Sequence, residues 1–197
     1  FAYLSLAAGT GALILFGMVQ LTMFAVGLAR GERFAAVAWG GFLLAVVGFV
    51  VLVAPGLAAP PPIGSLLMAL AGVAWGVYSL RGRGAGEPVA ATAGNFVRAA
   101  PLALALSLLL SASAHASARG VALAIASGAL TSGIGYVIWY AALPRLAALS
   151  AATVQLSVPV LAAIGGVLLL GEALTSRLVL ASAAILGGIA LVLTARR

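Results

Sequence analysis

Seven long apolar runs, separated by short polar connections, constrain the fold of this chain more than any other feature. A helix that crosses a bilayer needs about 20 mostly apolar residues. Only 7% of the 197 residues are charged, whereas a soluble domain is about a quarter charged. Transmembrane β-strands would show short alternating segments. The sequence therefore predicts an all-α polytopic membrane protein with complete spans at Ala7–Ala29, Ala35–Ala54, Ile63–Leu80, Ala90–Ala112, Gly120–Ala142, Ala147–Leu170 and Leu178–Ala195.

The basic residues predict how these spans are oriented. Short cytoplasmic loops are enriched in Lys and Arg. With a cytoplasmic C-terminus, only Arg119 and Arg177 fall outside, and the other eight lie at the inner face: Arg30, Arg33, Arg81, Arg83, Arg98, Arg145, Arg196 and Arg197. We therefore expect a multi-pass protein of the cytoplasmic (inner) membrane with its C-terminus inside. Arg98 lies about two turns inside its span, so its side chain must snorkel or face a polar cavity.

The few polar residues exclude several classes of function. The chain has no cysteine, one histidine (His115) and three acidic residues, too few for a disulfide framework or an ordinary metal cluster. We expect no cofactor, no metal and no nucleic-acid partner, because the arginines form no contiguous basic stripe. The sequence contains no phosphate-loop signature, so we do not expect ATP-driven pumping by this chain. No Asp or Glu lies within a complete span, so these spans supply no carboxylate for a proton relay.

An internal repeat relates the two ends of the chain. A shift of 140 residues places Gly31-Glu32 on Gly171-Glu172 and Gly48 on Gly188. Residues 61–197 then form a unit of five spans, the sixth to the tenth. Residues 1–54 are the remainder of a first unit: the end of its third span, then its fourth and fifth. About 80 further residues are expected before Phe1. An odd number of spans inverts the second unit relative to the first, as in many secondary transporters.

The order of motifs along nearly the whole chain carries a family resemblance. The motifs are Ala71–Tyr78 (AGVAWGVY), Gly135–Leu143 (GYVIWYAAL), Ala151–Leu174, which contains Val158-Pro159-Val160 and ends in LLGEAL, and Ile185–Leu191 (ILGGIAL). In these motifs the chain resembles the ten-helix EamA-type branch of the drug/metabolite transporter superfamily. It departs from the family pattern at Val19, where the first unit often has the proline that the second unit has at Pro159. The resemblance implies a bundle of two inverted five-helix repeats.

Four polar or aromatic residues are candidate solute contacts. Gln20 and Gln155 lie deep in their spans, where an amide must find a partner or meet water. They either form a helix–helix hydrogen bond or line a cavity and bind the solute. Asn95 is a weaker candidate near the cytoplasmic loop, and Tyr136 lies on a helix face that could line a pocket. Pro159 frees the carbonyl of Gln155 and is either a hinge for alternating access or a static kink.

Other conspicuous residues have structural interpretations. Five aromatic residues near the predicted cytoplasmic helix ends either form an aromatic belt or ordinary packing contacts, which we favour, or contribute to a substrate cage: Trp39, Trp75, Tyr78, Trp139 and Tyr140. Glu32 and Glu172 are interpreted as charged caps or topology anchors, and a role in energy coupling is less favoured. The pairs Gly165-Gly166 and Gly187-Gly188 are expected to allow close helix packing.

The repeat and the resemblance together favour a secondary transporter of small organic solutes that works by alternating access. A small-residue lining fits amino acids, nucleosides, sugars and lipophilic cations about equally, and neither flux direction, coupling ion nor oligomeric state follows from the residues. One alternative is a non-transporting membrane remnant or scaffold. An intramembrane enzyme is less favoured, because no buried carboxylate or histidine accompanies the serines.

Overall fold

The computed structural model describes residues 8–54, 61–109, 117–171 and 173–195, and within these ranges the chain forms helices and connections without strands. Seven helical spans in these ranges are long and apolar enough to cross a membrane. Their described ends lie within three residues of the predicted ends, so the prediction of a seven-span helical membrane protein is confirmed. The residue His115, the loop residue Glu172 and the ends predicted at Ala7 and Ala112 lie outside the described residues.

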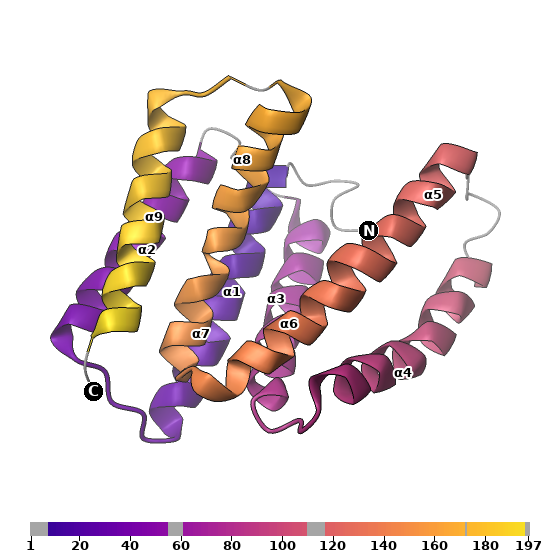
Figure 1. The fold of residues 1–197 in the computed structure, drawn as a ribbon, viewed down its shortest axis with the longest axis horizontal. Coiled ribbons are helices and arrows are strands. Elements are labelled where there is room, and N and C mark those ends of the chain that lie inside the picture. The colour runs from indigo at the N-terminus through magenta and orange to yellow at the C-terminus, as the bar shows by residue number, and fades with distance from the viewer. Residues whose placement is uncertain (1–7, 55–60, 110–116, 172, 196–197) are drawn as a thin grey trace. The chain divides into compact units, whose positions relative to one another are not determined.

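The seven spans comprise eleven described elements (Figure 1). They are α1 (Ala8–Ala29), α2 (Ala36–Val53), α3 (Pro62–Gly82), α4 (Pro88–Leu109), α5 (Ala118–Ala126), η4 (Ser127–Ile134), α6 (Gly135–Ala142), η5 (Leu143–Arg145), α7 (Ala148–Gln155), α8 (Ser157–Leu170) and α9 (Ser176–Thr194). Residues 1–80 and 146–197 form one compact unit, and residues 81–145 form another. This spatial division does not test the predicted repeats, 1–54 and 61–197, which stay a prediction.

Local sequence signals explain where several helices begin and end. Ser117 and Thr175 cap α5 and α9, because their hydroxyl oxygens accept hydrogen bonds from the Gly120 and Leu178 amides at 3.1 and 3.2 Å. The helix α8 ends at Gly171, whose φ of 70° is a left-handed conformation that favours glycine.

Two spans are irregular within the membrane-spanning length. The fifth span is continuous from Ala118 to Arg145, but its middle, η4, is wound as a π-helix. The sixth is broken at Leu156, between α7 and α8. Pro159 lies in the first turn of α8, where a missing amide hydrogen costs little. The break is therefore located as expected for Pro159, while the choice between hinge and static kink stays open.

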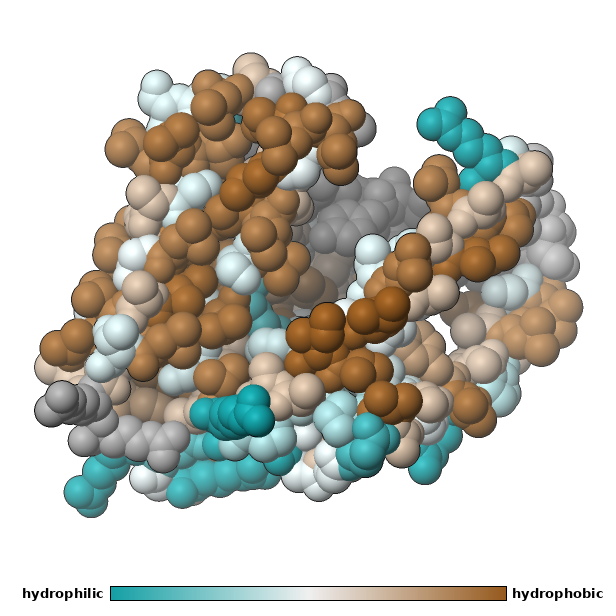
Figure 2. Space-filling model, viewed as in Figure 1, coloured by the Kyte–Doolittle hydropathy of each residue, from teal (hydrophilic) through white to brown (hydrophobic). Residues whose placement is uncertain are grey.

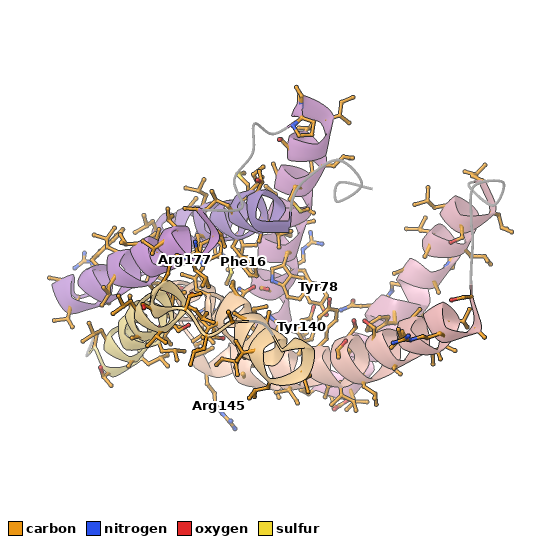
Figure 3. All side chains as sticks on the ribbon, turned by 90° about the horizontal axis from the view of Figure 1, so that it is seen from above. Phe16, Tyr78, Tyr140, Arg145 and Arg177 are labelled. Carbon is orange, nitrogen blue, oxygen red and sulfur yellow. The ribbon has the colours of Figure 1, made fainter. Side chains whose placement is uncertain are left out.

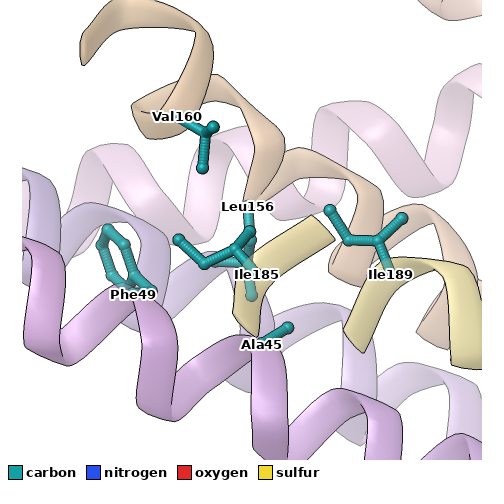
Figure 4. Packing of buried hydrophobic residues seen from close by; sticks show 6 residues of the cluster. All are labelled: Ala45, Phe49, Leu156, Val160, Ile185 and Ile189. Carbon is teal, nitrogen blue, oxygen red and sulfur yellow. The ribbon is translucent and has the colours of Figure 1, made fainter. Parts of the chain in front are cut away.

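The core of the first unit is the antiparallel contact between α2 and α9, which lie side by side (Figure 1). Both helices approach closely at glycines: a Cβ atom on Gly41 would lie 2.8 Å from the Leu191 Cβ, and one on Gly48 would lie 2.9 Å from the Ala181 carbonyl oxygen. A buried apolar cluster closes over this contact (Figure 4). Its members are Ala45 and Phe49 of α2, Ile185 and Ile189 of α9, and Leu156 and Val160.

The glycines of the two adjacent pairs differ in how closely a neighbouring helix approaches them. Gly188 packs against α2, as predicted, whereas Cβ atoms on Gly187 and Gly165 would meet no atom of the described residues within 4 Å. Gly188 therefore confirms the expectation of close packing for its pair, and the expectation for Gly165-Gly166 stays a prediction. Consecutive helix residues are rotated by about 100°, so only one glycine of an adjacent pair can point at a given neighbour.

The outward surface is apolar, as a lipid-facing surface should be. Leu102 and Leu168 are 75% and 76% exposed, and Figure 2 shows apolar residues along the helices, with hydrophilic ones gathered near helix ends. Trp39 packs beside Phe24, with ring centroids 4.8 Å apart, in agreement with the packing interpretation. Arg145 points away from the helices at the end of η5 (Figure 3).

Candidate solute-binding site

The two membrane amides lie at the crossing of α1 and α7. Gln20 and Gln155 are 6% and 5% exposed. The Gln20 Nε2 donates to the carbonyl oxygen of Ala152 at 2.8 Å, and the Gln155 Nε2 donates to the Met23 sulfur at 3.2 Å. Each amide thus reaches across to a residue three positions from the other amide. The structure brings together the two glutamines that the sequence singled out.

Trp75 joins this site from a third helix. Its indole N–H donates to the Gln155 Oε1, and its ring stacks on Tyr78 with centroids 5.3 Å apart. The helix α3 comes close enough because Gly72 and Gly76 face α1: a Cβ on Gly72 would lie 2.7 Å from the Met18 Cβ, and one on Gly76 would lie 2.9 Å from the Thr22 Cβ. This spacing of two glycines four residues apart is typical of closely packed membrane helices.

The hydrogen bonds favour different roles for the two glutamines. Gln155 is committed to the protein: its oxygen accepts from Trp75, and its nitrogen donates to Met23 and, at 3.4 Å, to the Ala151 carbonyl oxygen. Gln20 is only half committed, because its buried Oε1 has no hydrogen-bond partner among the described residues. Leaving such a group unsatisfied costs about 1–3 kcal/mol. The Gln20 oxygen is therefore a buried acceptor that no group of the described residues satisfies.

The other two candidates belong to the second unit. Asn95 of α4 donates from Nδ2 to the Tyr140 hydroxyl of α6 at 3.2 Å. Tyr136, one turn before Tyr140, stacks on Phe96 with centroids 5.9 Å apart. Asn95 also lines an open pocket of about 340 Å³, together with Tyr140 and Arg98. Two of the four predicted contacts therefore lie in each unit, and their role in solute binding stays a prediction.

Sequence reasoning favoured a structural role over a substrate cage for Trp75 and Tyr140, and therefore left both out of the predicted site. Both were assigned to an aromatic belt or packing, yet Tyr140 is only 4% exposed and accepts from Asn95. Tyr140 shares a helix face with Tyr136, which was a usable signal. No comparable signal marked Trp75, because its partner Gln155 lies 80 residues away.

Glu32 has the capping role that the sequence suggested. One of its carboxylate oxygens accepts from the Ala148 backbone amide, the first residue of α7, at 2.8 Å. The preceding residue, Ala147, has no side chain for capping, so a carboxylate from the α1–α2 connection replaces the local cap and favours the positive end of the helix dipole. A Cβ on Gly27 would lie 3.1 Å from the Ala148 Cβ, so α1 and α7 nearly touch here.

The comparison with known proteins identifies the family. A family model described as the EamA-like transporter family matches residues 62–194. The chain belongs to the EamA-like transporter family. An uncharacterized protein of Pseudomonas aeruginosa is 55% identical over 196 residues, which cover 100% of this chain and 68% of that protein. A solved crystal structure of a protein matches with a TM-score of 0.82 and 26% identity, over 96% of this chain and 68% of the other.

Membership of the EamA-like transporter family confirms the resemblance drawn from the motifs. Together with the seven apolar spans, it makes the chain a multi-pass membrane protein of the drug/metabolite transporter type. The family comprises transporters and not enzymes. Among the described residues there is no group of three or more His, Cys, Asp or Glu side chains placed to hold a metal ion.

Proposed function

We propose that this EamA-type protein is a secondary carrier of small organic solutes in the cytoplasmic membrane, working by alternating access between two inverted five-helix repeats. The observation that carries the proposal is the reciprocity of the α2–α9 contact. Gly41 approaches Gly188, and Gly48 approaches Ala181. The 140-residue shift pairs Gly41 with Ala181 and Gly48 with Gly188. When each residue is replaced by its counterpart, the contact between Gly41 and Gly188 becomes the contact between Ala181 and Gly48. A two-fold axis between equivalent helices produces such exchanged contacts.

Further features support the same relation. The shift places α2 on α9 and α1 on the span formed by α7 and α8. Gly31 and Gly171, which the shift pairs, follow α1 and α8, and both have left-handed φ angles, 76° and 70°. In inverted-repeat carriers the solute site lies near the bilayer midplane at the repeat interface. The buried glutamines at the α1–α7 crossing lie between two such equivalent spans.

The proposed inversion predicts opposite exposure of two loops. Because these 197 residues contain no cysteine, single cysteines can be introduced at Arg33, after α1, and at Leu174, before α9. In intact cells, a membrane-impermeant maleimide should label Leu174→Cys and should label Arg33→Cys only after the cells are opened. This result would also place the C-terminus in the cytoplasm. Labelling of both cysteines from the same side would contradict the inverted arrangement.

Transport itself is tested by solute counterflow. Proteoliposomes holding the purified protein and a high internal concentration of one unlabelled solute should accumulate the same labelled solute without ATP. We expect accumulation for at least one member of a panel of amino acids, nucleosides, sugars, lipophilic cations and organic anions, and none in protein-free liposomes. Failure across the panel would favour the non-transporting alternative.

A further inference from the structure

The second unit contains a pocket whose two arginines the carrier proposal leaves unassigned. It is open, has a volume of about 340 Å³ and is formed entirely by residues of the 81–145 unit. Alanine and glycine residues make up half of its lining, and the other half consists of Arg81, Asn95, Arg98 and Tyr140. Small apolar residues leave space, while two guanidinium groups and an amide provide donors. This combination is unusual in a chain with so few charged residues.

The positive charge of this pocket has no acidic counterpart in the lining. None of the described residues that line it is Asp or Glu. The nearest acidic residue in sequence, Glu87, is committed to the start of α4, where its carboxylate accepts from the Ala90 and Val89 amides at 2.6 and 2.9 Å. These hydrogen bonds lower the pKa of Glu87 below its usual value, so the group stays ionised as a helix cap.

Arg98 is directed toward the polar end of its helix. A Cβ on Gly94 would lie 3.1 Å from an Arg98 guanidinium nitrogen, so the side chain folds back along α4 over a glycine that leaves room for it. Arg98 is ten residues into α4, about 15 Å of helix rise, and folding back moves its charge a turn closer to the interface. The sequence left two interpretations for Arg98: its side chain snorkels, or it faces a polar cavity. In the structure it does both, because it folds back along α4 and lines the pocket.

Asn95 adds a neutral donor beside the two charges. Its Nδ2 donates to the hydroxyl of buried Tyr140 at 3.2 Å, which holds the amide at the pocket wall. Guanidinium groups match the planar geometry of a carboxylate and the oxygens of a phosphate, and such charge-assisted hydrogen bonds are about twice as strong as neutral ones.

We propose that this pocket binds the carboxylate or phosphate group of an organic anion, with Arg81 and Arg98 as charged donors and Asn95 as a neutral donor. The inference rests on the proposed function insofar as it takes the anion to be part of a carried solute. An anionic lipid headgroup has the same chemistry and is the other source of such a group.

Calorimetric titration of the protein in phosphatidylcholine nanodiscs tests the site. Succinate and inorganic phosphate should bind, and the uncharged dimethyl succinate should not. Arg98→Gln should weaken binding at least about tenfold, because it removes a charged donor. Gly94→Ala, which displaces the guanidinium but keeps the charge, should weaken binding less. The matched control is Arg177→Gln, which removes an exposed arginine of the other unit and should leave affinity unchanged.

Two results would overturn the proposal: no anion binding by the natural protein, or equal affinity in Arg98→Gln. Thermal unfolding of each variant verifies that it is folded, and Gly94→Ala provides an independent perturbation of the same guanidinium. Repeating the titration in phosphatidylglycerol nanodiscs separates the sources. Suppressed succinate binding there identifies a headgroup as the occupant, and unchanged binding identifies a soluble anion.

The counterflow assay keeps this inference separate from the carrier proposal. Counterflow of neutral or cationic solutes, without any anion binding, would overturn the anion pocket and leave the carrier standing. Anion binding that depends on Arg98, without counterflow of any solute, would leave the pocket and overturn the carrier.

Discussion

Gly188→Ala should strongly destabilise the protein, whereas Gly187→Ala, one residue earlier, should not. A Cβ on Gly188 would lie 2.7 Å from the Ala45 backbone nitrogen and 2.9 Å from its Cβ, so α2 would have to move away from α9. Overpacking of this kind typically costs about 1–3 kcal/mol. Because the contact is formed by backbone atoms that cannot rotate aside, we expect the upper end of this range. A Cβ on Gly187 would meet nothing within 4 Å in the part of the chain that the structure describes.

The adjacent control separates packing from helix propensity. Alanine favours a helix over glycine by about 1 kcal/mol at either position, so only the packing term differs between the two variants. Thermal unfolding in detergent, followed by tryptophan fluorescence, should show a lower midpoint for Gly188→Ala and an unchanged or higher one for Gly187→Ala. The pair Gly41→Ala and Gly40→Ala should repeat the contrast on α2, since only Gly41 faces α9. Equal midpoints within a pair would show that the α2–α9 contact is not close.

The spans could be predicted closely because each is specified by its own residues. An apolar run ends where a charge, a proline or a capping hydroxyl appears, and Ser117 and Thr175 are such local signals. The depth of Gln20 and Gln155 in the membrane could be predicted from the number of residues between each glutamine and the ends of its span. Both sit at the α1–α7 crossing in the structure because two polar groups in hydrocarbon are stabilised by partners on neighbouring helices.

The features that the sequence did not predict depend on how each helix is rotated about its axis. The sequence places Trp75 near a helix end but does not say which helix it faces, and that orientation results from Gly72 and Gly76 packing on α1. For the same reason Gly187 and Gly188 could not be distinguished, and Tyr140 was assigned by depth alone. The apolar periodicity that reveals a buried face in a soluble helix is weak here, because lipid-facing and core-facing residues are both apolar.

Gln20→Leu should abolish most transport while leaving the fold nearly intact. The variant loses one helix–helix hydrogen bond, to Ala152, and such bonds contribute about 0.6 kcal/mol in membranes. It also loses the buried Oε1 that has no partner among the described residues. If that oxygen accepts from the solute, counterflow should fall about tenfold or more, because an unmatched buried hydrogen-bonding group costs about 1–3 kcal/mol. Gln20→Glu keeps an acceptor and should retain more activity than Gln20→Leu for solutes that offer a donor.

Gln155→Leu should differ from Gln20→Leu in also lowering the unfolding midpoint, because Gln155 accepts from Trp75 and donates to Met23. The matched control is Thr153→Val on the same helix. Thr153 is fully buried, but its hydroxyl donates at 2.8 Å to the Leu149 carbonyl within α7, so its removal should leave counterflow nearly unchanged. The assignment of the glutamines to the solute path requires Gln20→Leu to affect transport far more than stability. Unchanged counterflow of every accepted solute in both glutamine variants would reduce the two amides to contacts that hold α1 against α7.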